Sequence, residues 1–392
     1  MNDPIVIVSA LRTPIGNFQG VFKNLSAPEL GATAIRAVQQ QSGLEPAAID
    51  EVLMGCVLSA GVGQAPARQA ALGAGLSEST GCTTLNKVCG SGMKAVMLAH
   101  DILVAGSQRI IIAGGMESMT NAPFLLLGVR TGYRLGHRAA IDHMLYDGLE
   151  DAYQKGTVMG IFAEDCAKLF GFTRQAQDEF ALTSLKRAKN AAEKGKFSRE
   201  LVPIVVENKG LEQTIEQDEG PQTVRAEKIP QLRPVFKTEG TITAANAASI
   251  SDGAAALLLM RRSEAEKRGF VPLATILGFA THAQKPALFT TAPVDAIQKL
   301  LATLQWTAQQ VDLFEINEAF AAVVMATMQV LQLPHDKVNV HGGACVLGHP
   351  IGASGARILI TLIHALLQNG LKRGIAALCI GGGEATAMAI EV

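Results

Sequence analysis

The segment AIRAVQQQSGLEPAAIDEVLMG, residues 34–55, is repeated later in the chain as AIQKLLATLQWTAQQVDLFEIN, residues 296–317. Both segments start with Ala-Ile, reach an aspartate sixteen residues later without a gap (Asp50 and Asp312), and continue into an apolar run. This pattern predicts a helix followed by a strand in each segment. Because short α/β units often share such a pattern, one repeat alone would not establish a duplication.

A second pair of segments repeats in the same order. CGSG at residues 89–92 leads through a predicted helix to the apolar run 109–115, and GASG at residues 352–355 leads through a helix one turn longer to the run 376–383. Two repeats in one order predict a duplicated α/β domain, each half with a mixed sheet and helices on its faces. Periodicity also predicts a helix at 27–42 and strands at 5–9, 51–57 and 274–278.

The chain between the repeats differs in composition. Residues 121–246 are richer in charges and turns and include a predicted helix at 175–194, so we interpret them as an inserted loop domain. The apolar run 252–260 predicts a strand that returns to the sheet of the first half. Three parts are therefore predicted. The N-terminal half consists of residues 1–120 and 247–270, and its last residues, 261–270, are a linker. The insertion is 121–246, and the C-terminal half is 271–392.

Composition and charge limit the classes of function. The 392 residues, 48% hydrophobic and 18% charged, are enough to bury a large core. A net charge of −1 without a basic block does not favour a nucleic-acid partner. Six cysteines without CxxC pairs favour a reducing compartment and no metal site. The apolar run near the N-terminus is short for a signal peptide or a membrane span, so we expect a cytoplasmic protein with no membrane partner.

The motif VCGSGMK, residues 88–94, places Cys89 between a predicted strand at 82–86 and a predicted helix. Free amides and the positive dipole at a helix start favour a thiolate, and Gly90 and Gly92 leave room for a ligand. These features predict a nucleophilic cysteine. Cysteine is also among the most often buried residues, so an inert packing role stays open.

Three further glycine-bordered stretches carry reactive groups: NEAF at 317–320, GGACVLGHPIGASG at 342–355 and LCIGGG at 378–383. Each is predicted to follow a strand. Open α/β sheets bind ligands beyond the carboxyl ends of their strands, so we expect all four stretches to meet in one cleft.

The residue types in these stretches suit acyl transfer through a thiol. His349, in a Gly-His-Pro turn, would favour the Cys89 thiolate and supply a donor to an oxyanion, unless it is a surface residue. Cys379, beside three glycines, is interpreted as an acid and base with a lowered pKa, or else as a buried strand cysteine. Asn317 either caps a helix or positions a water.

Together the four motifs resemble those of the thiolases, the acyl-CoA C-acetyltransferases, over essentially the full chain. The resemblance implies a duplicated five-layer αβαβα core with a loop domain inserted in the first half. It also implies a dimer or tetramer, acyl-CoA substrates, and coenzyme A as substrate and product with no tightly bound cofactor.

The resemblance further implies a role for each reactive residue. Cys89 takes an acyl group from CoA after activation by His349, and Cys379 removes the α-proton of a second acyl-CoA. One oxyanion hole consists of His349 and a water held by Asn317. The other consists of the backbone amides of Cys89 and Gly381.

The substrate-binding stretches depart from the family pattern. The residues that the resemblance assigns to substrate and CoA are Leu149, Met159, Arg225, Ala248, Ser249, Phe289, Ala319 and Phe320. Ala248 stands where many relatives have a pantetheine-binding serine, Val158 precedes Met159 where they have histidine, and Arg225 is the candidate to stack on adenine. Phe289 either shortens the acyl pocket or lines a longer one.

The DGLEDAY stretch at 147–153 favours short acyl chains, so the expected activity is that of an acetyl-CoA C-acetyltransferase. A medium- or long-chain 3-ketoacyl-CoA thiolase of fatty-acid β-oxidation stays open, and a ketoacyl synthase is a more distant alternative. A non-catalytic CoA-binding subunit is the alternative from another class, although such a protein would not need a second thiol.

Overall fold

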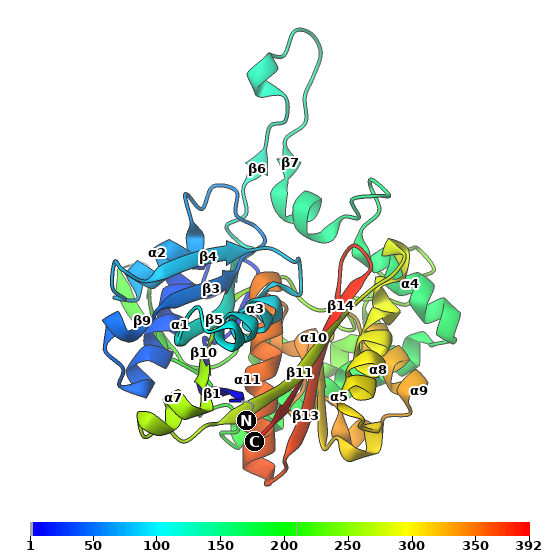
Figure 1. The fold of residues 1–392 in the computed structure, drawn as a ribbon. Coiled ribbons are helices and arrows are strands. Elements are labelled where there is room, and N and C mark those ends of the chain that lie inside the picture. The colour runs from blue at the N-terminus through cyan, green and yellow to red at the C-terminus, as the bar shows by residue number, and fades with distance from the viewer. Residues whose placement is uncertain (1–2, 209) are drawn as a thin grey trace.

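The computed structural model describes residues 3–208 and 210–392, and a continuous mixed β-sheet structure runs through its centre (Figure 1). The strand order is β12-β13-β14-β11 in the C-terminal half and β1-β10-β5-β3-β4 in the N-terminal half. The halves join where β1 pairs with β11, with Val6 opposite Thr275. The strands are β1 (Ile5–Arg12), β3 (Glu51–Gly55), β4 (Gly81–Leu85), β5 (Ile110–Ser118), β10 (Ser251–Arg261), β11 (Ala274–Ala283), β12 (Leu313–Ile316), β13 (Arg373–Ile380) and β14 (Glu384–Glu391).

The two halves repeat the same elements, which confirms the predicted duplication. The first repeat forms α1 (Ala27–Ser42) and β3, and its copy forms α8 (Ala292–Leu304) and β12. In the first half Asp50 accepts hydrogen bonds from the backbone N–H groups of Arg109 and Ile110 at the start of β5. In the second half Asp312 accepts them from residues 372 and 373 at the start of β13. The repeated aspartate therefore joins two parallel strands in each half.

Helices form three layers around the sheets, as the resemblance implied. The central layer is α3 (Ser91–Ala105) and α11 (Ile351–Asn369), which pack on each other and on strands of both halves. The outer layers are α1 with α2 (Pro66–Gly73) on one side and α8 with α9 (Ala321–Leu331) on the other. The four-residue difference between α11 and α3 confirms the predicted extra turn.

The central helices are unusually apolar. Val88–Ala105 and Ile351–Asn369 have the length and hydropathy of a membrane span, yet 50% of the first and 89% of the second is buried inside the protein. Packing against strands of both halves of the sheet therefore accounts for their apolar composition.

The insertion contains helices, a hairpin and a projecting arm. Its elements are α4 (Met159–Phe170), α5 (Arg174–Glu193), the hairpin β8 (Ile204–Asn208) and β9 (Leu211–Ile215), and the arm carried by β6 (Phe124–Leu125) and β7 (Ile141–Asp142). The arm rises well clear of the rest of the molecule (Figure 1). The predicted helix at 175–194 is α5, shifted by one residue at each end.

Some predicted boundaries were wrong. The linker 261–270 contains a short helix, α7 (Arg262–Lys267), and strands β1 and β11 extend beyond the predicted 5–9 and 274–278. β3 ends two residues before the predicted position. The apolar run 252–260 does return to the first half, where β10 pairs with both β1 and β5.

Candidate active site

Cys89 lies on a sharp turn between β4 and α3. The preceding Val88 has φ 47°, a left-handed conformation that is costly for a β-branched residue. Gly90 is the N-cap of α3, so Cys89 directly precedes the helix, as predicted. The turn holds Cys89 at the start of the central layer.

The glycines of this motif make room for the protein itself. A Cβ on Gly90 would overlap the side chain of Ile380, and one on Gly92 would lie 2.9 Å from the backbone nitrogen of Ala356 in α11. The expectation that both glycines admit a ligand was therefore wrong. Gly92 allows the start of α3 to meet α11 at backbone contact, and Gly90 leaves room for the Ile380 side chain.

His349 lies in the turn between the short helix α10 (Ala344–Leu347) and α11, so it does not follow a strand as predicted. It is 7% exposed, which excludes a surface role. Its Nδ1 lies 2.6 Å from the Ser354 hydroxyl, which donates to the Pro350 carbonyl. When the single hydroxyl proton of Ser354 goes to Pro350, Nδ1 of His349 donates to Ser354 and Nε2 is the acceptor of the ring.

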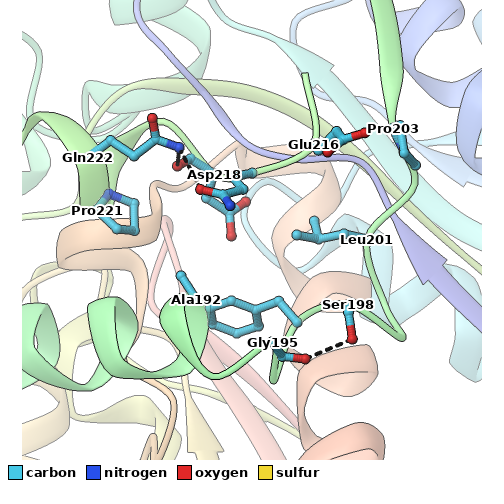
Figure 2. Close-up of a pocket in the computed structure, with 11 residues that line it drawn as sticks. Ala192, Gly195, Ser198, Leu201, Pro203, Glu216, Asp218, Pro221 and Gln222 are labelled. Carbon is cyan, nitrogen blue, oxygen red and sulfur yellow. Dashed lines mark hydrogen bonds between the residues drawn. The ribbon is translucent and has the colours of Figure 1, made fainter. Parts of the chain in front are cut away.

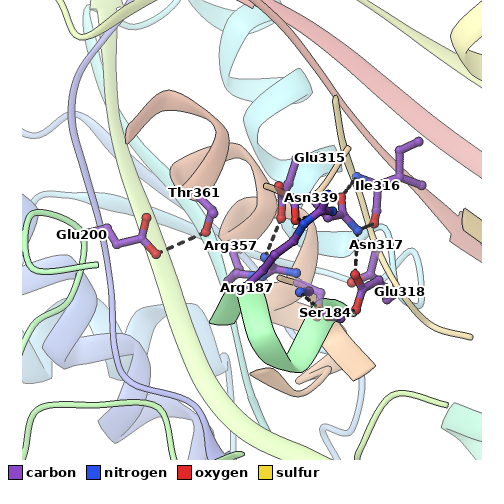
Figure 3. A network of polar contacts seen from close by, with 12 residues as sticks. Ser184, Arg187, Glu200, Glu315, Ile316, Asn317, Glu318, Asn339, Arg357 and Thr361 are labelled. Atoms are coloured by element: carbon purple, nitrogen blue, oxygen red, sulfur yellow. Dashed lines mark hydrogen bonds and ion pairs between the residues drawn. The ribbon is translucent and has the colours of Figure 1, made fainter. Parts of the chain in front are cut away.

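A polar network fixes the backbone around Asn317 (Figure 3). The Asn339 side chain pairs with both backbone groups of Ile316 and donates to the Glu318 carboxylate. The backbone N–H of Asn317 donates to the Ala377 carbonyl on β13. None of these bonds uses the Asn317 side chain.

The side-chain amide of Asn317 is therefore not needed to hold this backbone. Its Nδ2 lies 3.4 Å from Nδ1 of His349, and its buried Oδ1 has no hydrogen-bond partner within residues 3–208 and 210–392. The alternative of a helix cap was wrong, because α9 begins at Ala321 with Phe320 as its N-cap. A buried amide oxygen without a partner costs free energy, which a bound water or substrate would recover.

Four of the five predicted catalytic residues meet in one cavity of about 80 Å³. Cys89, His349, Cys379 and Gly381 line it, whereas Asn317 does not and lies beside His349. Seven of the eight predicted substrate residues line it too: Leu149, Met159, Ala248, Ser249, Phe289, Ala319 and Phe320. Arg225 is exposed and lies outside this lining. Sequence reasoning missed Met119, Gly148, Ile250 and Ile351, although all of these except Met119 lie within two residues of predicted ones.

Burial sets the charge state of the site. It raises the pKa of the Cys89 thiol to about 11, even though the backbone N–H groups of Gly381 and Cys89 lower it. Burial also raises the pKa of Cys379, with a further contribution from nearby Cys89. Burial, then Arg357, lowers the pKa of His349 to about 3. The expected resting thiolate and the lowered pKa of Cys379 were therefore wrong: the site holds two thiols and a neutral imidazole.

A larger cavity of about 380 Å³ lies elsewhere, between α5 and the hairpin β8–β9 (Figure 2). Its lining includes Asp218 but no cysteine or histidine. The Asp218 carboxylate already pairs with the buried guanidinium of Arg12, 2.7 Å away. Within the described residues, no group of three or more His, Cys, Asp and Glu is arranged to hold a metal ion. The cavity around Cys89 is therefore the candidate site.

A duplicated α/β fold whose two halves bring two thiols and an imidazole into one apolar cavity defines an enzyme of thiol-based acyl transfer. The thiolase N-terminal domain matches residues 5–263 and the thiolase C-terminal domain matches residues 270–392. The chain belongs to the thiolase family.

Individual relatives are similar over the whole chain. The chain is 47% identical to the acetyl-CoA acetyltransferase of Cupriavidus necator over 389 residues, which is 99% of each protein. It is 46% identical to a probable acetyl-CoA acyltransferase of Staphylococcus aureus, over 99% of this chain and 98% of that protein. The crystal structure of the acetyl-CoA acetyltransferase of Bacillus anthracis superposes with a TM-score of 0.96 at 39% identity, and each chain is fully covered.

Proposed function

We propose that this thiolase catalyses the reversible Claisen condensation of two acetyl-CoA molecules to acetoacetyl-CoA and CoA, through an acyl group on Cys89. The observation that carries the proposal is the meeting of Cys89, Cys379 and a neutral His349 in one cavity. The similarity to acetyl-CoA acetyltransferases supports the substrate. CoA is then substrate and product, and the reaction needs no resident cofactor.

The neutral site supports a reaction in which each proton transfer has a defined donor and acceptor. Nε2 of His349 takes the Cys89 proton as the sulfur attacks acetyl-CoA, and Cys379 gives its proton to the departing CoA sulfur. The Cys379 thiolate then removes the α-proton of a second acetyl-CoA, whose carbanion attacks the acyl group on Cys89. The Cys89 thiolate leaves and recovers its proton from His349, so all three groups return to their resting state.

Two sets of hydrogen-bond donors support the charged intermediates. The backbone N–H groups of Cys89 and Gly381 lie close enough to the Cys89 sulfur to lower its pKa, a position suited to the oxyanion of the tetrahedral intermediate. The Asn317 amide beside His349 is suited to hold the water that stabilises the enolate.

The packing of Phe289 supports a short acyl chain. Phe289 is 3% exposed and packs edge to face against Phe162, with the ring centroids 6.3 Å apart. The same apolar cluster includes Phe320 and Cys379, so the ring is a fixed wall of the acyl pocket. The longer-chain 3-ketoacyl-CoA thiolase is the second candidate, which this wall disfavours.

The structure shows how the segment around Ala248, which lacks the pantetheine-binding serine of many relatives, is held. The backbone N–H of Ala248 donates to the Ala319 carbonyl, a bond that needs no serine side chain. The neighbouring Ser249 lines the cavity, and its Oγ lies 3.3 Å from that of Ser251. We therefore expect the pantetheine pocket to be kept at this segment.

The test compares CoA-dependent thiolysis of acetoacetyl-CoA with that of a medium-chain 3-ketoacyl-CoA, with Cys89→Ala as the blank. We expect cleavage of acetoacetyl-CoA to dominate, and Phe289→Ala to raise the relative rate on the longer substrate by about tenfold or more, the usual scale for pocket size. Comparable rates on both substrates in the unchanged enzyme would favour the longer-chain candidate. No cleavage by the folded protein would refute the proposed reaction.

We also propose that the protein is a cytoplasmic homo-oligomer. Six free cysteines support a reducing compartment. Strand β4 at the open edge of the sheet leads directly to Cys89, and the projecting arm exposes several apolar side chains. Both features suit contact with a second copy of the chain.

A further inference from the structure

Close to the site, the first residues of α3 and α11 pack against the last residues of β3 and β5. These elements are in direct backbone contact. A Cβ on Gly115 would overlap the carbonyl oxygen of Gly352, and one on Gly55 would lie 2.8 Å from the same oxygen. A Cβ on Gly352 would lie 2.6 Å from the Glu117 carboxylate. Segments of both halves therefore converge on a single buried carboxylate.

Glu117 accepts hydrogen bonds from both halves of the molecule. Its Oε2 accepts from the backbone N–H groups of Val57, at 3.0 Å, and Gly352, at 2.9 Å. Its Oε1 accepts from the backbone N–H of Leu58 at 3.0 Å and from the Cys56 thiol at 3.8 Å. The side chain is fully buried. Four donors surround the two oxygens, three from the loop after β3 and one from α11.

Hydrogen bonds oppose the effect of burial on this carboxylate. Burial raises the pKa of Glu117 to about 7, and the four hydrogen bonds lower it. Gly352 lies in the first turn of α11, where the helix dipole favours a negative charge. The ionised form alone can accept all four bonds, because a protonated carboxyl must donate one.

The bonds of Glu117 lead to both reactive residues. Gly352 lies three residues after His349, in the helix that begins directly after the His349 turn. On the other side, the N–H of Cys56 donates to the Leu85 carbonyl at the end of β4, four residues before Cys89. Cys89 also packs against the apolar cluster that contains Leu58.

We propose that Glu117 is a positioning residue for acyl transfer: it ties the start of α11 to the loop after β3 and thereby sets the distance between His349 and Cys89. This inference rests on the proposed function. Glu117 does not line the cavity, so it acts through the two segments that it joins. A misplacement of about 1 Å between a base and its nucleophile can cost about a hundredfold in rate.

The test is Glu117→Gln, which keeps the shape of the side chain but turns an NH2 group toward backbone donors. We expect kcat for acetoacetyl-CoA thiolysis to fall by about ten- to a hundredfold, while KM stays within about twofold because the CoA-binding segments are untouched. Glu117→Asp keeps the charge and is expected to recover part of the lost kcat. The control Asp312→Asn removes a carboxylate that also accepts two backbone N–H groups, at the opposite end of the strands, and should keep kcat.

Labelled acetyl-CoA measures the fraction of chains in which Cys89 can be acylated. Each rate is divided by this fraction, so that poor folding of a variant is not mistaken for a slower reaction. An unchanged rate per acylated site in Glu117→Gln, with only a lower melting temperature, would overturn the inference and leave Glu117 a purely structural residue. Equal losses in Glu117→Asp and Glu117→Gln would also overturn it. Inactivity of the unchanged enzyme would instead refute the proposed function.

Discussion

Among the reactive residues, Asn317 has a side-chain oxygen that the protein leaves unused. Its backbone is held by β13 and by the Asn339 network, while its Oδ1 has no partner within the described chain. We therefore expect Asn317→Ala to fold normally and to lose about a hundred- to a thousandfold in kcat, the usual cost of one oxyanion-hole donor. Steady-state thiolysis and a melting curve measure the two effects. Wild-type activity in the folded variant would refute the role.

His349 makes stability depend on pH. Its pKa falls from the ordinary 6.5 to about 3 on folding, so the folded protein keeps it neutral while the unfolded chain binds a proton below pH 6.5. Its contribution to stability is thus complete above pH 6.5 and is lost as the pH falls toward 3.

The comparison is with His349→Asn, which cannot titrate. From pH 7 to pH 5 the wild type should lose about 2 kcal/mol of unfolding free energy relative to His349→Asn, because each pH unit below 6.5 contributes about 1.4 kcal/mol. Urea unfolding at the two pH values measures it. A difference that does not change with pH would show that His349 is not buried as a neutral group.

For individual residues, the sequence predicted which reactive side chains line the cavity but not their protonation states. Cys89, His349 and Cys379 stand out because glycines border them, a feature visible in the chain itself. The predicted thiolate was wrong because it rested on the helix start, whereas the burial that raises the pKa of Cys89 depends on segments from both halves. The contact between His349 and Ser354 likewise could not be found without coordinates.

Among the elements, the close contact between β5 and α11 is the most sensitive to substitution. In Gly115→Ala the new methyl group would overlap the Gly352 carbonyl, which is backbone and cannot turn aside. We expect a loss of stability of about 2 kcal/mol or more, together with lower activity, because overpacking shifts the start of α11. The matched control is Gly81→Ala on the edge strand β4, where the nearest atom is 3.6 Å away. Equal melting temperatures for the two variants would contradict this account.

Elements with a strong hydrophobic period were predicted well, and those without one were not. Helix α1 has the predicted bounds because a clear apolar face lies between Ser26 and the left-handed Gly43. The helix α7 is charged and six residues long, so it has no period to detect. The turn of His349 was assigned to a strand end because sequence does not show that α10 intervenes.

For the whole molecule, the projecting arm is the part on which the proposed homo-oligomer depends. Its apolar side chains are exposed to an unusual degree, Leu135 by 92% and Phe124 by 67%. We expect sedimentation analysis to give the mass of an oligomer, and replacement of residues 126–138 by a short glycine-serine linker to give a smaller species that stays folded. A monomeric wild type, or an unchanged oligomer in the variant, would contradict the proposed role of the arm.

The duplicated architecture was predictable because two repeats occur in the same order. The way in which the two halves pack together was not predictable, because it joins segments more than 200 residues apart. β1 pairs with β11, and α3 is buried against α11. For the same reason the sequence did not reveal that the glycines at 90 and 92 serve the contact between halves.

In the proposed reaction Cys89 carries the acyl group and Cys379 transfers the α-proton, and labelled acetyl-CoA followed by peptide mass spectrometry distinguishes the two roles. We expect one acetyl group per chain on the peptide of Cys89, with an equal amount of CoA released. We also expect Cys379→Ala to be acetylated, more slowly because the proton donor to CoA is gone, and to form no acetoacetyl-CoA. Acetyl groups on Cys379, or turnover of acetoacetyl-CoA by Cys89→Ala, would refute these roles.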